Sequence, residues 1–135
     1  MTEQEIDERL IDQLVRAFYD RVRVDPLIGP IFNSRIQDWE PHLVRIAAFW
    51  SSVMLKSGRY QGQPMRLHLP LPIDAQHFDR WLALFETSAR ELCPVQIAEQ
   101  FVARAHMIGR SLEMGIAAAN GTMLMNGERY IRKSA

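Results

Sequence analysis

Apolar residues recur at spacings of three and four along most of the chain, which places them on one face of an α-helix. The first such stripe covers residues 6–22. Thr2 and Glu5 have the spacing of a capping box and predict the start of this helix. It is expected to end at Asp25-Pro26, because a residue before proline disfavours the α region. Residues 26–36 should then form a turn or a short tight helix.

The same periodicity predicts three further helices. One runs from Asp38 as N-cap to about Lys56, one starts after Asp74 as N-cap and reaches Leu92, and one runs from Pro94 to about Asn120. Residues 58–73 are rich in glycine and proline, and only a single helical turn fits there, near 65–69 with Pro64 as its first residue. The pattern therefore predicts an all-α protein with an irregular loop in its middle.

The length of 135 residues fits one domain. Hydrophobic residues make up 47% and charged residues 24%, ordinary values for a folded chain, so extended disorder is not expected. From residue 122 onwards no clear period remains. We therefore expect a domain over residues 1–121 and a mobile tail over 122–135.

Charge and cysteine content exclude several classes of protein. Sixteen basic and 16 acidic side chains balance to a net charge of zero, without the basic excess of a general nucleic-acid binder. The single cysteine, Cys93, excludes an internal disulfide and a multi-cysteine metal site, and it is compatible with a reducing compartment. The start of the sequence does not resemble a signal peptide, and no apolar run reaches membrane-span length. A cytoplasmic location without a membrane or nucleic-acid partner is predicted.

The four histidines are the first candidates for chemistry. His42 lies on the inner face of the second predicted helix, where a hydrogen-bonded core residue and a functional residue are both consistent with the pattern. His68 lies in the short turn between two proline-rich stretches, which suits either an axial metal ligand or an exposed loop residue. His77 and His106 flank polar positions and are expected at the surface.

Two aromatic residues with polar atoms offer a similar choice. Tyr19 interrupts the aliphatic stripe of the first helix, and Trp81 lies on the inner face of the third. Each is either a core residue or a hydrogen-bond donor directed into a cavity. Cys93 has no obvious paired base and is interpreted as a structural thiol. The sequence contains neither a dinucleotide-binding nor a phosphate-binding glycine motif.

Taken in order, several short motifs resemble those of the truncated haemoglobins, specifically their third group. The resemblance covers about residues 6–118, and its most specific part couples the loop from Tyr60 to Pro64 with His68. The motifs are Phe18-Tyr19, Gly29-Pro30-Ile31-Phe32-Asn33, Trp39-Glu40-Pro41-His42, Phe49-Trp50, Gly58 to Pro64 with His68, and Phe78 through Trp81 to Phe85.

The resemblance implies a two-over-two helical sandwich around one haem b per chain. It places His68 as the ligand of the iron, with Tyr19, His42 and Trp81 on the distal side where a diatomic ligand binds. The residues that it implies around the cofactor are Phe32, Ile46, Phe49, Arg59, Tyr60, Leu67, His68, Phe78 and Trp81. Of these, Arg59 and Tyr60 are the implied partners of the haem propionates. No Cys-x-x-Cys-His motif for covalent attachment is present.

Three functions remain open from the sequence. The first is reversible binding of dioxygen, with carbon monoxide and nitric oxide as further ligands and oxygen transport as a role. The second is an enzyme at the same iron, for nitric oxide dioxygenation or peroxide reduction, with a reductase as a candidate partner. The third is a haem-free helical interaction module, which leaves the polar groups on the inner faces unexplained.

Overall fold

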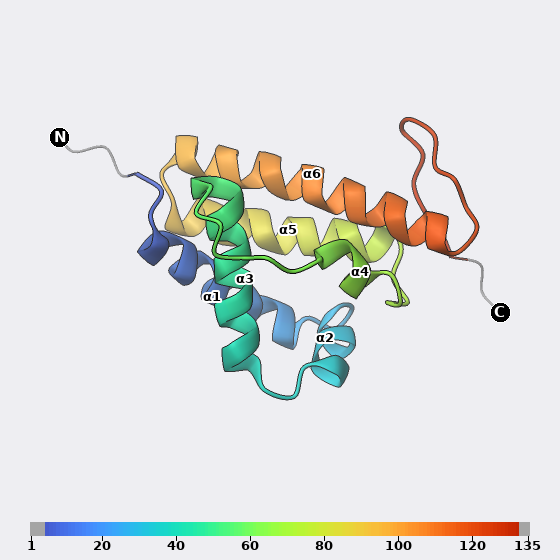
Figure 1. The fold of residues 1–135 in the computed structure, drawn as a ribbon, viewed down its shortest axis with the longest axis horizontal. Coiled ribbons are helices and arrows are strands. Elements are labelled where there is room, and N and C mark those ends of the chain that lie inside the picture. The colour runs from blue at the N-terminus through green and yellow to red at the C-terminus, as the bar shows by residue number, and fades with distance from the viewer. Residues whose placement is uncertain (1–4, 133–135) are drawn as a thin grey trace.

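The computed structural model describes residues 5–132, and within them the regular elements are all helices (Figure 1). The six helices are α1 (Glu8–Val24), α2 (Gly29–Arg35), α3 (Trp39–Leu55), α4 (Pro64–His68), α5 (Ala75–Leu92) and α6 (Val95–Ala119). The all-α prediction is confirmed. No helix among these residues combines the length and the apolar character needed to cross a membrane.

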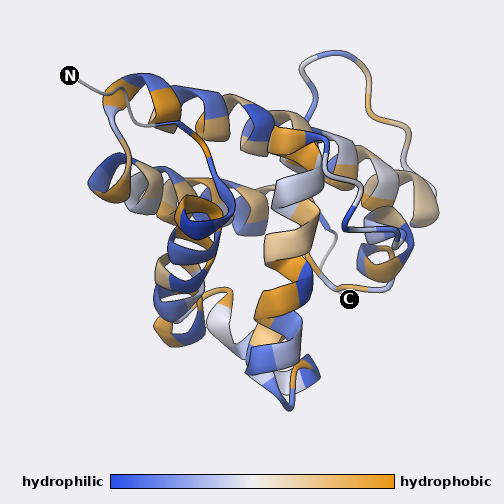
Figure 2. Cartoon of the chain, turned by 60° about the vertical axis from the view of Figure 1, so that its left-hand side comes forward, coloured by the Kyte–Doolittle hydropathy of each residue, from blue (hydrophilic) through white to orange (hydrophobic). Residues whose placement is uncertain are grey.

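The helices form two packed pairs. Helices α5 and α6 lie side by side, while α1 packs against both α3 and α5, so that the pair α1–α3 lies over the pair α5–α6 (Figure 1). Figure 2 shows hydrophobic and hydrophilic residues on different sides of the same helices, as the periodicity of the sequence predicts. The short helix α4 lies against α6 and is joined to α3 and α5 by irregular chain.

Helix α1 begins later than the sequence predicts. Asp7 is its N-cap, and the Asp7 carboxylate accepts a hydrogen bond of 2.8 Å from the backbone N–H of Leu10. Of the predicted capping box, Thr2 lies outside the described residues and Glu5 precedes the helix. The helix ends at Asp25, the residue before Pro26, as predicted.

Aromatic rings fill the centre of the fold. Phe85 of α5 packs edge-on against Phe18 at 5.2 Å between ring centroids and stacks on Trp50 at 5.0 Å. Trp81, one turn earlier on α5, stacks on Phe85 at 5.9 Å. Burial of each such ring contributes on the order of 2–3 kcal/mol to stability. This cluster buries Trp50 in the core and fixes the position of Trp81 relative to α1.

The chain after α6 makes contacts that the sequence pattern does not predict. Gly121 has a positive φ of 84°, which ends the helix in a left-handed turn. In this structure residues 122–132 return along α6 to the start of α5, while the mobility of a tail from residue 122 stays a prediction. Leu124 and Tyr130 are buried there, and Arg129 pairs with Glu113 and Asp79. Such contacts join residues far apart in the sequence and leave no periodic signal.

Candidate functional site

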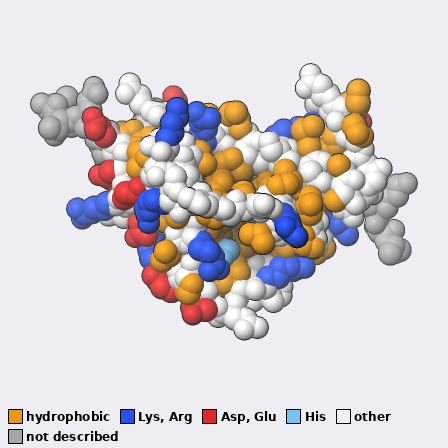
Figure 3. Space-filling view, in the orientation of Figure 1, with side chains coloured by type: hydrophobic (Ala, Val, Ile, Leu, Met, Phe, Trp, Pro, Cys, Tyr) orange, Lys and Arg blue, Asp and Glu red, His pale blue; other side chains and the backbone are white. Residues whose placement is uncertain are grey.

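A cavity of about 650 Å³ lies between the two helix pairs and α4. Its walls are largely aliphatic and aromatic side chains from all six helices and from the loops before α2, α3, α4 and α5. In Figure 3, hydrophobic side chains gather across the middle of the face that carries α4, with Lys and Arg side chains and one visible histidine among them. Eight predicted cofactor-contact residues line it: Phe32, Ile46, Phe49, Tyr60, Leu67, His68, Phe78 and Trp81.

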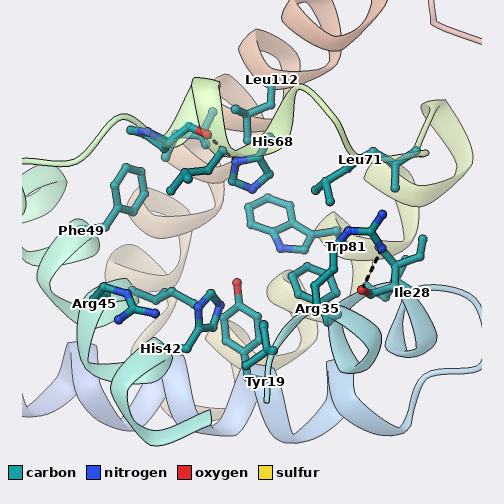
Figure 4. Close-up of a pocket in the computed structure, with 18 of the residues that line it drawn as sticks. Tyr19, Ile28, Arg35, His42, Arg45, Phe49, His68, Leu71, Trp81 and Leu112 are labelled. Carbon is teal, nitrogen blue, oxygen red and sulfur yellow. Dashed lines mark hydrogen bonds between the residues drawn. The ribbon is translucent and has the colours of Figure 1, made fainter. Parts of the chain in front are cut away.

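His68 stands on one side of the cavity, at the end of α4 (Figure 4). Its Nδ1 atom lies 2.6 Å from the carbonyl oxygen of Pro64. A carbonyl oxygen only accepts hydrogen bonds, so Nδ1 must carry the proton and donate it. In the neutral ring, Nε2 then keeps its lone pair, which is the state of a histidine that binds a metal.

Tyr19, His42 and Trp81 come together around the opposite part of the cavity. Figure 4 shows the Tyr19 hydroxyl directed into the cavity, with His42 beside it and the Trp81 indole between Tyr19 and His68. Burial raises the pKa of Tyr19 well above its ordinary value, and the neighbouring Trp81 only partly opposes that rise. Tyr19 therefore stays protonated and remains a donor at neutral pH.

His42 carries a polar atom whose partner is missing among the described residues. Its Nε2 is buried and makes no hydrogen bond there, and leaving such an atom unpaired costs about 1–3 kcal/mol. The ring packs edge-on against Tyr19 and Trp39, at 6.1 and 5.6 Å between centroids. Burial lowers the pKa of His42, and the nearby Arg45 and His68 lower it further. His42 is thus a neutral imidazole that lines the cavity with a free hydrogen-bonding atom.

The arginines at the cavity differ from the prediction. Arg59 does not line the cavity, because its guanidinium pairs with the Glu8 carboxylate at the start of α1. Arg35 and Arg45 line the cavity instead. The sequence holds a signal for Arg45, which follows His42 by three positions and therefore shares its helix face. Arg35 is the last residue of α2 and has a comparable signal, because it follows Phe32 by three positions.

His77 is the second difference, since the sequence places it at the surface. The structure makes it part of the cavity wall and of the cap of α5. Its Nδ1 accepts a hydrogen bond of 3.0 Å from the backbone N–H of Asp74. The spacing of three residues from the predicted N-cap could have indicated this role. His106 is exposed on α6, as predicted.

These residues meet the physical requirements of a haem. The cofactor needs a large apolar slot and one neutral imidazole, and the cavity offers both on the sides just described. Leu67, next to His68, is 68% exposed although it lines the cavity. A flat apolar group in the cavity would cover this side chain and would approach the unpaired Nε2 of His42.

Comparison with known proteins gives a consistent result. The family model of the bacterial-like globins matches residues 6–109. Group 3 truncated hemoglobin ctb of Campylobacter jejuni is 37% identical over 108 residues, which cover 76% of this chain and 85% of that protein.

Solved structures agree. The crystal structure of the group III truncated hemoglobin from Campylobacter jejuni superposes with a TM-score of 0.77 at 36% identity, covering 84% of this chain and 93% of that one. The truncated oxygen-avid haemoglobin from Bacillus subtilis gives a TM-score of 0.71 at 29% identity, covering 79% and 93%.

Proposed function

Because this chain belongs to the bacterial-like globins, and among them to the truncated haemoglobins, we propose that it holds one haem b in the cavity and binds dioxygen reversibly. Membership of the family makes it a haem protein for small diatomic ligands. When bound, the haem supplies an iron with an open position for such a ligand. One observation carries the proposal: His68 faces Tyr19, His42 and Trp81 across one apolar cavity.

His68 is the proposed ligand of the iron. The Pro64 carbonyl holds the imidazole in one tautomer and one orientation, so that Nε2 is available to the cofactor. The aliphatic and aromatic walls exclude water and hold the porphyrin. The cations for its two propionates are proposed to be Arg35 and Arg45, which line the cavity, in place of Arg59, which is paired with Glu8.

Tyr19 and Trp81 are the proposed donors to the diatomic ligand. Dioxygen acquires partial negative charge in a haem site and carbon monoxide acquires little, so O–H and N–H donors favour dioxygen. A neutral hydrogen bond contributes about 0.5–1.5 kcal/mol, or up to roughly tenfold in affinity. The buried Tyr19 hydroxyl stays protonated because its pKa is raised, which keeps this donor available across the physiological pH range.

The test is a set of ligand measurements on the purified full-length protein. We expect a Soret band with one haem per chain, a stable dioxygen complex, and a slow dioxygen dissociation rate together with slow autoxidation. A colourless protein that also fails to take up added haem would overturn the proposal. Fast catalytic consumption of nitric oxide, or of peroxide, would assign the same cavity to an enzyme and exclude simple reversible binding as its role.

A further inference from the structure

We propose that residues 122–132, here the C-terminal segment, are a positioning element for the proximal side of the cavity rather than an appendage. The proposal rests on the proposed function, since it assigns His68 to the proximal side. The family model ends at residue 109, well before this segment. Three independent sets of contacts tie the segment to the residues around His68.

The first set is apolar. Leu124 and Tyr130 are buried in a cluster that also contains Ile73, Phe78 and Leu112. The last three side chains line the cavity. The C-terminal segment therefore supplies the layer directly behind the cavity wall, and its removal would expose the back of that wall to water.

The second set is ionic and surrounds Glu113 of α6, which is only 2% exposed. The Glu113 carboxylate accepts hydrogen bonds from Nε of Arg129 at 3.0 Å and from the backbone N–H of Tyr130 at 2.8 Å. Arg129 also donates to Asp79 of α5 at 2.8 Å. A buried carboxylate is stable only when it is paired and hydrogen-bonded. Glu113 and Arg129 thus fix the segment between α5 and α6.

The third set joins the segment to the first turn of α5. The Tyr130 carbonyl accepts a hydrogen bond of 2.8 Å from the backbone N–H of Ala75. Asp74, the N-cap of α5, accepts one of 3.0 Å from the backbone N–H of Arg132. The short loop from His68 ends at this turn, so the segment holds the far end of the loop that follows the proposed iron ligand.

Helix α4 itself packs against the same cluster. Met65 and Leu69, which lie three residues before and one residue after His68, both contact it. The Met65 sulfur occupies the space that a Cβ atom at Gly115 of α6 would take, so this side chain packs directly against the backbone of α6. The contacts therefore run without a gap from the C-terminal segment through the cluster to α4 and His68.

Two pairs of neighbouring substitutions test the inference on the haem-loaded, full-length protein. Arg129→Gln removes the guanidinium from Glu113, while Arg132→Gln is its control because Arg132 contributes a backbone N–H and has an exposed side chain. Tyr130→Leu reduces a side chain that is 6% exposed, while Ile131→Ala alters one that is 75% exposed.

We expect Arg129→Gln and Tyr130→Leu to speed haem transfer to an excess of apomyoglobin by roughly fivefold and to shift or broaden the iron–histidine stretching band of the ferrous protein. The two controls should behave as wild type. In the haem-free protein, the same two variants should speed hydrogen exchange of the α4 amides and of the loop that follows α4.

The inference would be overturned if all four variants equalled wild type in three quantities. These are the rate of haem transfer, the position of the iron–histidine band and the hydrogen exchange of the α4 amides. A fall in unfolding temperature in Arg129→Gln and Tyr130→Leu without any change in these three quantities would also overturn it, because that is the result of a purely structural role. If wild type takes up no haem, the proposed function fails, and the hydrogen exchange of the haem-free protein still decides whether the segment holds α4.

Discussion

The side chain of His68 and the carbonyl of Pro64 are joined by a hydrogen bond of 2.6 Å within a helix of only five residues. Proline is well suited to the first position of so short a helix, because its missing N–H would have no partner there. Its carbonyl lies one turn before His68 and accepts the Nδ1 proton. The helix therefore orients the ring through its own backbone, and no carboxylate within residues 5–132 is hydrogen-bonded to it.

We expect His68→Gly to lose most of its haem, because the substitution removes the proposed iron ligand while leaving the apolar cavity. Added imidazole should restore part of the Soret absorbance by occupying the space of the missing ring. The control is His106→Ala, on the exposed face of α6. Alanine is used there because glycine would weaken the helix. An unchanged Soret band and unchanged ligand binding in His68→Gly would show that another group binds the iron.

Tyr19→Phe should raise the dioxygen dissociation rate by roughly tenfold, because it removes an O–H donor and keeps the ring. Stopped-flow displacement of dioxygen measures this rate directly. Trp81→Phe should act in the same direction with a larger loss of packing, since the indole stacks on Phe85. Tyr60→Phe removes a hydroxyl from the same cavity at a residue that the resemblance places at a propionate and not at the diatomic ligand, so it controls for the dioxygen dissociation rate alone. Equal dioxygen dissociation rates in wild type, Tyr19→Phe and Trp81→Phe would show that neither side chain donates to the ligand and that both only pack in the core.

His42 is expected to act chiefly as a gate. It lies near the start of α3, and Tyr19 and Trp81 already offer two donors to one small ligand. His42→Ala should therefore raise ligand association rates and change dioxygen dissociation less than Tyr19→Phe does. Flash photolysis gives both rates, and a double-mutant cycle with Tyr19 shows whether the two share one network. An association rate equal to that of wild type would contradict the gate.

Regular spacing explains which parts of this molecule were predictable. The four long helices and the turn that bears His68 follow from apolar periodicity and from Asp and Pro at helix starts, and the structure confirms them within a few residues. The pairings that the sequence does not predict depend on contacts across the fold. Arg59 forms an ion pair with Glu8, fifty-one positions away, and Arg129 forms one with Glu113 of α6. Neither pairing leaves a periodic pattern, so local reasoning could not find it.

Arg35 and Arg45, rather than Arg59, are the proposed partners of the haem propionates, and substitutions can distinguish the two assignments. Arg45→Gln should speed haem loss, because it removes a cation from the cavity that is proposed to hold a propionate. Arg59→Gln should change the rate little, because its guanidinium is paired with Glu8. Haem transfer to apomyoglobin measures both. A large effect of Arg59→Gln with none of Arg45→Gln would restore the assignment that the family resemblance implies.

Asp25 links the loop before α2 to α5. Its side chain is 1% exposed, and its carboxylate accepts hydrogen bonds from the backbone N–H groups of Leu27 and Ile28 at 3.0 Å each and from Arg80 at 2.6 Å. Burial alone would raise the pKa of Asp25, but the hydrogen bonds from Ile28, Arg80 and Leu27 outweigh it and leave the pKa below the ordinary value.

A folded-state pKa below that of the unfolded chain means that Asp25 stabilises the fold above about pH 4 and ceases to do so as the pH falls through its folded pKa. Asp25→Asn should therefore lower the free energy of unfolding by about 1–3 kcal/mol at neutral pH, and the difference from wild type should shrink as the solution is acidified. Urea unfolding at a series of pH values measures this difference. Asp20→Asn, at an exposed position of α1, is the matched control. A constant difference between Asp25→Asn and wild type across the acid range would contradict a lowered pKa, because the lost stability would then not depend on the charge of Asp25.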